Sequence, residues 1–268
     1  MSSCQSLVHV GQFRRAKTSS RPRMRSLRSQ IRKLLRPMLR RAVRFGWPSY
    51  ESHEHELHFR RCLEFIRFNG VDGDIFEFGV GSGSTLAMLN KLAASSLEKN
   101  RSDYRLIGFD SFQGMPASEG RDAEMHNETS LGVSFAKGEF QSSIDEVWQN
   151  LRESSAEVER ITLVEGWYDK TLTSELKQSL EVTSASLINI DCDLYSSTIA
   201  ALRWSESLIR QGTIVNFDDW FCYKGSEEHG EARAFKEFLV ANSHLSAKEF
   251  STYSWHGKAF LMSRADSH

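Results

Sequence analysis

Short apolar runs alternate with segments of helical periodicity from residue 55 onward. The strand-like runs are residues 74–80, 104–110, 160–166, 185–191 and 213–219. The helical segments are residues 55–70, 84–96, 142–153, 174–181, 197–212 and 227–242. Residues 248–255 and 257–264 have the pattern of a closing hairpin. Two-sided apolar strands that alternate with helices predict an α/β fold, a doubly wound, mostly parallel seven-stranded sheet with helices on both faces and a C-terminal antiparallel hairpin.

Two local signals mark helix boundaries within this pattern. Ser143 and Glu146 have the spacing of a capping box, which predicts a helix that begins just after Ser143. Gly70 follows the first periodic segment and is a typical helix stop. Residues 113–139 show no periodicity, and a loop of this length inside a compact domain is usually functional or mobile.

Charge divides the chain into two regions. Residues 1–50 contain 13 of the 34 Lys and Arg residues and none of the 35 Asp and Glu residues, so the rest carries 21 basic and 35 acidic side chains. Residues 1–25 have the composition of a disordered segment, whereas residues 26–45 predict a basic amphipathic helix interrupted at Pro37. We therefore expect a basic arm at 1–50 and a globular domain at 51–268. The helix suits packing on the body or on a partner subunit, or peripheral contact with an anionic membrane.

Composition excludes several classes of protein. The four cysteines have no C-x-x-C spacing, which argues against a disulfide framework or a structural zinc site. No apolar run approaches the roughly 20 residues of a membrane span, and the N-terminus lacks the apolar block of a secretory signal. The acidic body and the lack of aromatic residues among the arm's cations do not favour nucleic acid binding. We expect a cytoplasmic protein; peripheral membrane attachment, organelle import and a homo-oligomer are left open.

A glycine turn follows the first strand-like run, in the sequence EFGVGSGST. Gly79, Gly81 and Gly83 allow the backbone to turn tightly and to approach a ligand before the next helix begins. Ser84 stands where a dinucleotide fingerprint would need its third glycine. The turn therefore predicts a ligand site and disfavours an NAD-dependent dehydrogenase.

The second and third strand-like runs also end in candidate ligand contacts. Asp110 ends the second run, where an acid can accept both hydroxyls of a ribose. Trp167 follows the third run, and it either covers an adenine or closes the edge of the core.

The fourth and fifth runs lead into acids, Asp191 and Asp193 in one case and Asp218 and Asp219 in the other. One strand–helix–strand unit separates the two pairs, so we expect them to meet at one edge of the sheet. Carboxylates crowded without a counter-charge repel one another, and a hard cation such as Mg²⁺ relieves the repulsion. The predicted metal ligands are Asp191, Asp218 and Asp219; the alternative is that all four acids are helix caps and turn residues. Asp193 is expected to cap the helix that begins near Ser196, or to lie in a second layer around the metal.

The chain from about residue 55 to 264 resembles the class I S-adenosylmethionine-dependent methyltransferases, and more specifically the macrocin O-methyltransferase family. The matching stretches, in order, are FEFGVGSGST, GFDSFQGMP, KGEF, EGWYDKTL, IDCDLYSST and NFDDW. The resemblance implies a Rossmann-like fold, S-adenosyl-L-methionine as cofactor and Mg²⁺ as metal. Cys192 stands where a glycine is common, and Asn216 and Phe217 replace an aliphatic pair.

Carried over onto this chain, the resemblance implies a full set of cofactor contacts. It places the methionine end over Glu77, Gly79 and Gly81 and the ribose on Asp110, and it supports Asp191, Asp218 and Asp219 as the metal ligands. The expected cofactor-binding residues are Glu77, Gly79, Gly81, Ser82, Gly83, Ser84, Thr85, Asp110, Ser111, Phe112, Glu165, Trp167 and Asp191.

The implied reaction is O-methylation of a small-molecule acceptor, a sugar or glycoside hydroxyl, with a phenol or catechol hydroxyl as the alternative. A base must take the hydroxyl proton, and the catalytic candidates are Asp191 and, from the long loop, His126. The alternative from another class is a membrane- or nucleic-acid-associated protein in which the basic arm dominates and the body only binds a ligand.

Overall fold

A computed structural model describes residues 10–11, 47–97, 104–117, 119–120, 122, 137–138, 140–154 and 157–265. The predictions of a disordered segment at 1–25 and of a helix at 26–45 lie outside these residues, as does His126. The first long helix, α2, spans Trp47–Asn69 and ends at Gly70 as predicted, because Gly70 adopts φ +63°. The expected boundary between residues 50 and 51 therefore lies inside α2.

The described strands form one sheet in the order β1-β4-β3-β2-β5-β6-β8-β7. β2 (Asp74–Phe78), β3 (Leu106–Asp110), β4 (Ile161–Glu165), β5 (Ala185–Ile190) and β6 (Ile209–Phe217) run parallel. β7 (Leu245–Tyr253) and β8 (Gly257–Arg264) form the antiparallel hairpin beside β6. The predicted seven-stranded mixed sheet is confirmed, and the two-residue β1 (Val10–Gly11) adds an antiparallel edge.

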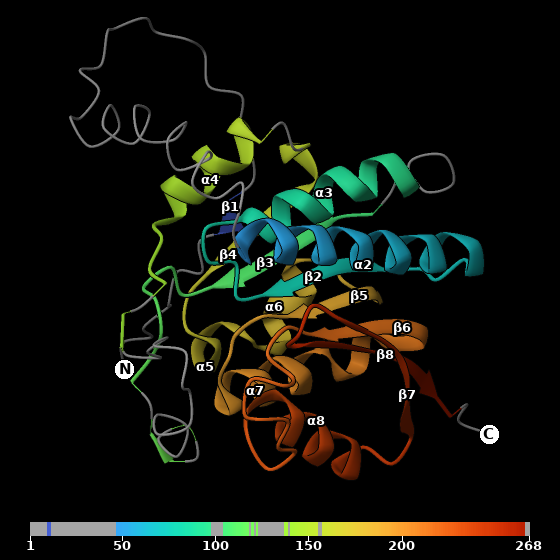
Figure 1. The fold of residues 1–268 in the computed structure, drawn as a ribbon. Coiled ribbons are helices and arrows are strands. Elements are labelled where there is room, and N and C mark those ends of the chain that lie inside the picture. Colours follow the sequence, from blue (N-terminus) through green and yellow to red (C-terminus); the bar gives the residue numbers. More distant parts are fainter. Residues whose placement is uncertain are drawn as a thin grey trace, which may run out of the picture.

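Helices cover both faces of the sheet (Figure 1). One face carries α2, α3 (Ser84–Leu97) and α4 (Ile144–Glu153), and α4 begins with the predicted capping box at Ser143. The other face carries α5 (Tyr168–Thr171), α6 (Ser174–Ser179), α7 (Tyr195–Ser205) and α8 (Gly230–Ala241). The short 3₁₀ helices η3 (Val158–Arg160) and η4 (Glu206–Leu208) precede β4 and β6. Along the described part of the chain, no helix is both long and apolar enough to cross a membrane.

One predicted helix is wrong over its second half. The helical spacing at 197–212 ends at Ser205, and β6 begins at Ile209 rather than at Thr213. Ile209 pairs with Ala185 of β5, and Gly212 adopts φ +88°, a conformation that a right-handed helix excludes. Pairing with a strand distant in sequence therefore overrides the local apolar spacing.

His58 fixes α2 on the β7–β8 side of the sheet. Its buried ring stacks on Tyr253 with 3.9 Å between ring centroids, and it contacts Ser251 Oγ at 3.2 Å and Cys62 Sγ at 3.4 Å. Burial lowers the pKa of His58 to about 4, so the ring is neutral in the folded protein at pH 7.

The neutral His58 should make the protein sensitive to acid. Between pH 6.5 and pH 4 the unfolded chain binds a proton at His58 that the folded chain does not, so the free energy of unfolding falls as the pH drops through this range. We expect protonation of His58 in the unfolded chain to lower the free energy of unfolding by about 3 kcal/mol by pH 4. Urea denaturation at several pH values, on the wild type and on His58→Gln, isolates this effect. Identical pH dependence in the two proteins would contradict the prediction.

Candidate active site

The glycine turn between β2 and α3 lies at the point where the strand order reverses. Gly79 adopts φ +94°, and a Cβ on it would lie 1.7 Å from the backbone oxygen of Asp191. The two strand ends are joined here, since the Asp191 amide donates to the Phe78 carbonyl at 2.8 Å. Only glycine therefore allows β2 and β5 to approach this closely.

Asp110, at the end of β3, holds the turn from the opposite side. Its Oδ2 accepts a hydrogen bond from the Gly81 amide at 2.9 Å, and its Oδ1 accepts one from the Phe112 amide at 2.7 Å. The carboxylate is thereby fixed at the edge of a cavity, where an acid can also accept a hydroxyl of a bound ribose.

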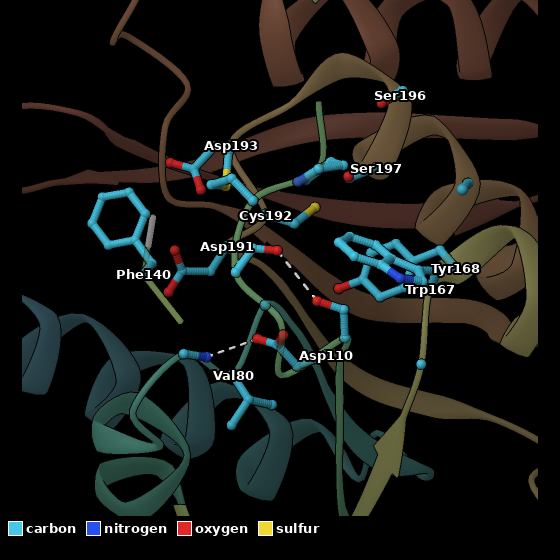
Figure 2. Close-up of a pocket in the computed structure, with 18 of the residues that line it drawn as sticks. Val80, Asp110, Phe140, Trp167, Tyr168, Asp191, Cys192, Asp193, Ser196 and Ser197 are labelled. Carbon is cyan, nitrogen blue, oxygen red and sulfur yellow. Dashed lines mark hydrogen bonds between the residues drawn. The ribbon is translucent and has the colours of Figure 1, made fainter. Parts of the chain in front are cut away.

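The cavity has a volume of about 580 Å³, a size typical of small-molecule sites. Its wall comes from the carboxyl ends of β2, β3, β4 and β5, the location expected for ligands in a doubly wound sheet. In Figure 2, Trp167 and Tyr168 lie on one side of this cavity, and Asp191, Asp193 and Phe140 lie on the other. The arrangement brings an aromatic wall and an acidic wall to one space.

Most of the residues expected to bind a cofactor line this cavity. They are Gly79, Gly81, Ser82, Ser84, Thr85, Asp110, Ser111, Trp167 and Asp191. Four expected residues do not line it, namely Glu77, Gly83, Phe112 and Glu165. Glu77 and Phe112 are buried, and Gly83 packs against Val147 of α4, so these three support the wall from behind. Burial raises the pKa of Glu77 well above its ordinary value.

Several residues of the wall were not among the expected cofactor contacts. Val80 and Gly166 are the last residues of predicted strand-like runs, and Cys192 and Asp193 were singled out only in relation to the predicted metal site. Met115, Pro116 and Phe140 come from loops, and only the tertiary structure brings them to the cavity. Tyr168, Asp169, Ser196, Ser197, Ala200 and Gly114 complete the wall.

Asp193 does not cap α7, contrary to one of the two predictions made for it. The N-cap position of α7 is Leu194, which makes no side-chain cap hydrogen bond. Asp193 adopts φ +58°, and this turn directs it to the wall of the cavity. Burial, the Asp219 charge and a hydrogen bond with Asp219 raise the pKa of Asp193 well above its usual range.

The four acids at the ends of β5 and β6, Asp191, Asp193, Asp218 and Asp219, are close enough to shift one another's pKa values. Burial and then the charges of Asp218, Asp219 and Asp193 raise the pKa of Asp191 well above its ordinary value. Asp219 is held at its backbone, because its amide donates to the buried carboxylate of Glu231 at 2.8 Å. Carboxylate oxygens are the ligands that a hard cation prefers, and these four side chains are only partly buried, so the chemistry of the residues fits Mg²⁺.

The closest grouping of possible ligand atoms differs from the predicted one. Among the described residues, the atoms of His55, Asp218 and His256 lie within 4.8 Å of one another, whereas Asp191, Asp218 and Asp219 do not form such a group. His55 comes from α2 and had no sequence signal, and His256 lies in the β7–β8 turn. Burial opposes the charge of Asp218, but the hydrogen bond and charge of His55 and the charge of His256 outweigh it and lower the pKa of Asp218.

The chain is similar in sequence to known O-methyltransferases. The sequence profile of the macrocin O-methyltransferase (TylF) family matches residues 39–245. A demethyldecarbamoylnovobiocin O-methyltransferase from Streptomyces niveus is 25% identical over 195 residues, which cover 72% of this chain and 70% of the relative. An 8-demethyl-8-(2,3-dimethoxy-alpha-L-rhamnosyl)-tetracenomycin-C 4'-O-methyltransferase from Streptomyces olivaceus is 28% identical over 163 residues, covering 59% of this chain and 57% of that protein.

Solved structures support the fold. The O-methyltransferase NovP is similar with a TM-score of 0.62 and 22% identity, covering 79% of this chain and 80% of that one. CalS11, a calicheamicin methyltransferase, has a TM-score of 0.62 and 21% identity, covering 91% of this chain and 99% of that one. Since the family profile spans most of the sheet and every strand end of the cavity, this chain belongs to the macrocin O-methyltransferase family and is an S-adenosylmethionine-dependent O-methyltransferase.

Proposed function

We propose that this enzyme methylates a hydroxyl of a sugar or glycosylated small molecule, with Mg²⁺ bound by Asp191, Asp218 and Asp219. The observation that carries the proposal is the group of acids at two neighbouring strand ends. Asp191 lines the cofactor cavity, and Asp218 and Asp219 follow β6, which pairs with β5. Among its described residues, the cavity wall contains no Lys or Arg that could neutralise these acids. A bound cation would supply the missing positive charge and would lower the pKa of an acceptor hydroxyl.

The residues that line the cavity support this placement of the cofactor. Gly79 and Gly81 would face its methionine end with backbone alone, and Asp110 would accept the ribose hydroxyls. Trp167 lines the opposite wall, where an aromatic ring can cover the adenine. This arrangement would direct the sulfonium methyl toward the acids.

In the proposed reaction the acceptor oxygen attacks the methyl carbon as the bond from that carbon to sulfur breaks. The products are a methyl ether and S-adenosylhomocysteine, and the hydroxyl proton goes to a carboxylate. Asp191 and Asp193 both line the cavity, and burial with the charges of neighbouring acids raises the pKa of each, so these two are the candidates to take the proton. Holding the acceptor oxygen, the methyl carbon and the sulfur in line would supply a further part of the rate enhancement.

The names of two relatives support a glycosidic acceptor. The tetracenomycin enzyme is named for 4'-O-methylation of a compound that bears a rhamnosyl group, and CalS11 is described as a calicheamicin methyltransferase. A phenolic acceptor remains the second candidate, since a cation beside a hydroxyl would activate a catechol by the same chemistry.

The test is a methyl-transfer assay with S-adenosylmethionine over panels of glycosides and catechols, with EDTA and with added Mg²⁺. We expect product from glycosides, loss of activity in EDTA and recovery on addition of excess Mg²⁺. Full activity in EDTA would contradict the role of the cation while leaving O-methylation intact. Turnover of catechols alone would contradict the glycoside acceptor.

A further inference from the structure

Two histidines distant in sequence hold Asp218. His55 Nε2 of α2 lies 2.8 Å from Asp218 Oδ1. His256 Nδ1 donates to the backbone carbonyl of Asp218 and lies 3.7 Å from its Oδ2. The side chain and the backbone of one residue are therefore fixed from two different elements. The side chains of His55 and Asp218 are only 13% and 19% exposed.

Packing fixes the ring of His55 in turn. Tyr253 meets it edge to face at 5.3 Å between ring centroids and 74° between planes, and the ring of His58, one turn along α2, stacks on the same Tyr253. The Tyr253 hydroxyl donates to the carbonyl of Phe217, the residue before Asp218, at 3.1 Å. The position of His55 is therefore coupled to the strand end that carries Asp218.

We propose that His55 is a positioning residue that acts through Asp218, orienting this carboxylate as a ligand of the divalent cation. The inference rests on the proposed cation and on the hydrogen bond from His55 to Oδ1. A hydrogen bond to one oxygen of a ligating carboxylate fixes its rotamer and leaves the second oxygen available, and such outer partners commonly change metal affinity 10- to 100-fold. Because His55 belongs to α2, this role gives a function to a helix that lies outside the predicted ligand-binding turns.

The experiment measures the affinity of the full chain for Mn²⁺ by EPR, with S-adenosylmethionine affinity and melting temperature determined in parallel. His55→Phe keeps a ring against Tyr253 and removes the hydrogen-bond donor, so we expect Mn²⁺ binding to weaken about 10- to 100-fold with S-adenosylmethionine affinity unchanged. His55→Gln keeps an N–H donor at a similar reach, and we expect its Mn²⁺ affinity within about threefold of the wild type.

A matched control is available elsewhere in the chain. His244 Nε2 lies 2.7 Å from Glu206 Oε1 on the surface, so His244→Phe removes a similar histidine–carboxylate pair away from the cavity and should not change Mn²⁺ affinity. Equal Mn²⁺ affinity in His55→Phe and the wild type would overturn this inference alone. Equal losses in His55→Gln and His55→Phe would show that the imidazole itself is required and would overturn it too. A wild type that binds no Mn²⁺ would overturn both this inference and the proposed cation, but not O-methylation.

Discussion

Asp191→Asn should lower the turnover number for methyl transfer by about 10²- to 10⁴-fold, the range for loss of a general base. The substitution removes the charge and the proton-accepting oxygen from the cavity wall but keeps the shape of the side chain. The fold should not suffer, because burial and four neighbouring acids oppose the charged form of Asp191. We therefore expect an unfolding free energy equal to or above that of the wild type. Single-turnover methyl transfer and urea denaturation measure the two effects.

Two comparisons make the Asp191 result specific. Asp145→Asn makes the same chemical change on the exposed surface of α4, and its turnover number should match the wild type within about twofold. Asp193→Asn distinguishes the two carboxylates that line the cavity, since the residue that takes the proton should show the larger loss. Near-normal turnover in Asp191→Asn, with S-adenosylmethionine saturating, would rule out this residue as both base and essential ligand.

Gly79→Ala should cost on the order of 3–5 kcal/mol of folding free energy and abolish cofactor binding. The new Cβ would lie 1.7 Å from the backbone oxygen of Asp191, and neither backbone can move without breaking the contact between β2 and β5. The residue would also have to adopt φ +94°. Urea denaturation and calorimetric titration with S-adenosylmethionine measure the two losses.

Gly225→Ala is the matched control for this substitution. Gly225 also has a positive φ, +73°, but a Cβ on it would meet no atom within 4 Å. It should therefore lose only the roughly 1–2 kcal/mol of a left-handed residue and keep its affinity for S-adenosylmethionine. If both variants lost the same stability, the close approach of β2 and β5 would not be the reason for a glycine at position 79.

The cavity was largely predictable because its residues follow strand ends. Gly79, Asp110, Trp167 and Asp191 each come just after an apolar run, and parallel strands bring their carboxyl ends to one edge. The wrong helix prediction at 209–212 has the opposite cause. The apolar spacing there fits a helix, and only the pairing of Ile209 with Ala185 makes the segment part of strand β6. The prediction that Asp193 caps α7 failed for a similar reason, because a backbone turn at φ +58° directs that side chain to the cavity wall instead.

The sequence by itself determined the class of fold, the family and the strand ends that carry ligand contacts, because these depend on local periodicity and on short motifs. The tertiary structure alone decided which groups surround Asp218. His55 is 163 residues away from it and His256 is 38 residues away, in segments whose patterns indicate only a helix and a hairpin. Hydrogen bonds between such distant segments follow from how α2 and the β7–β8 turn pack on the sheet. The periodicity of apolar residues along the chain predicts each element but does not specify how distant elements pack against one another.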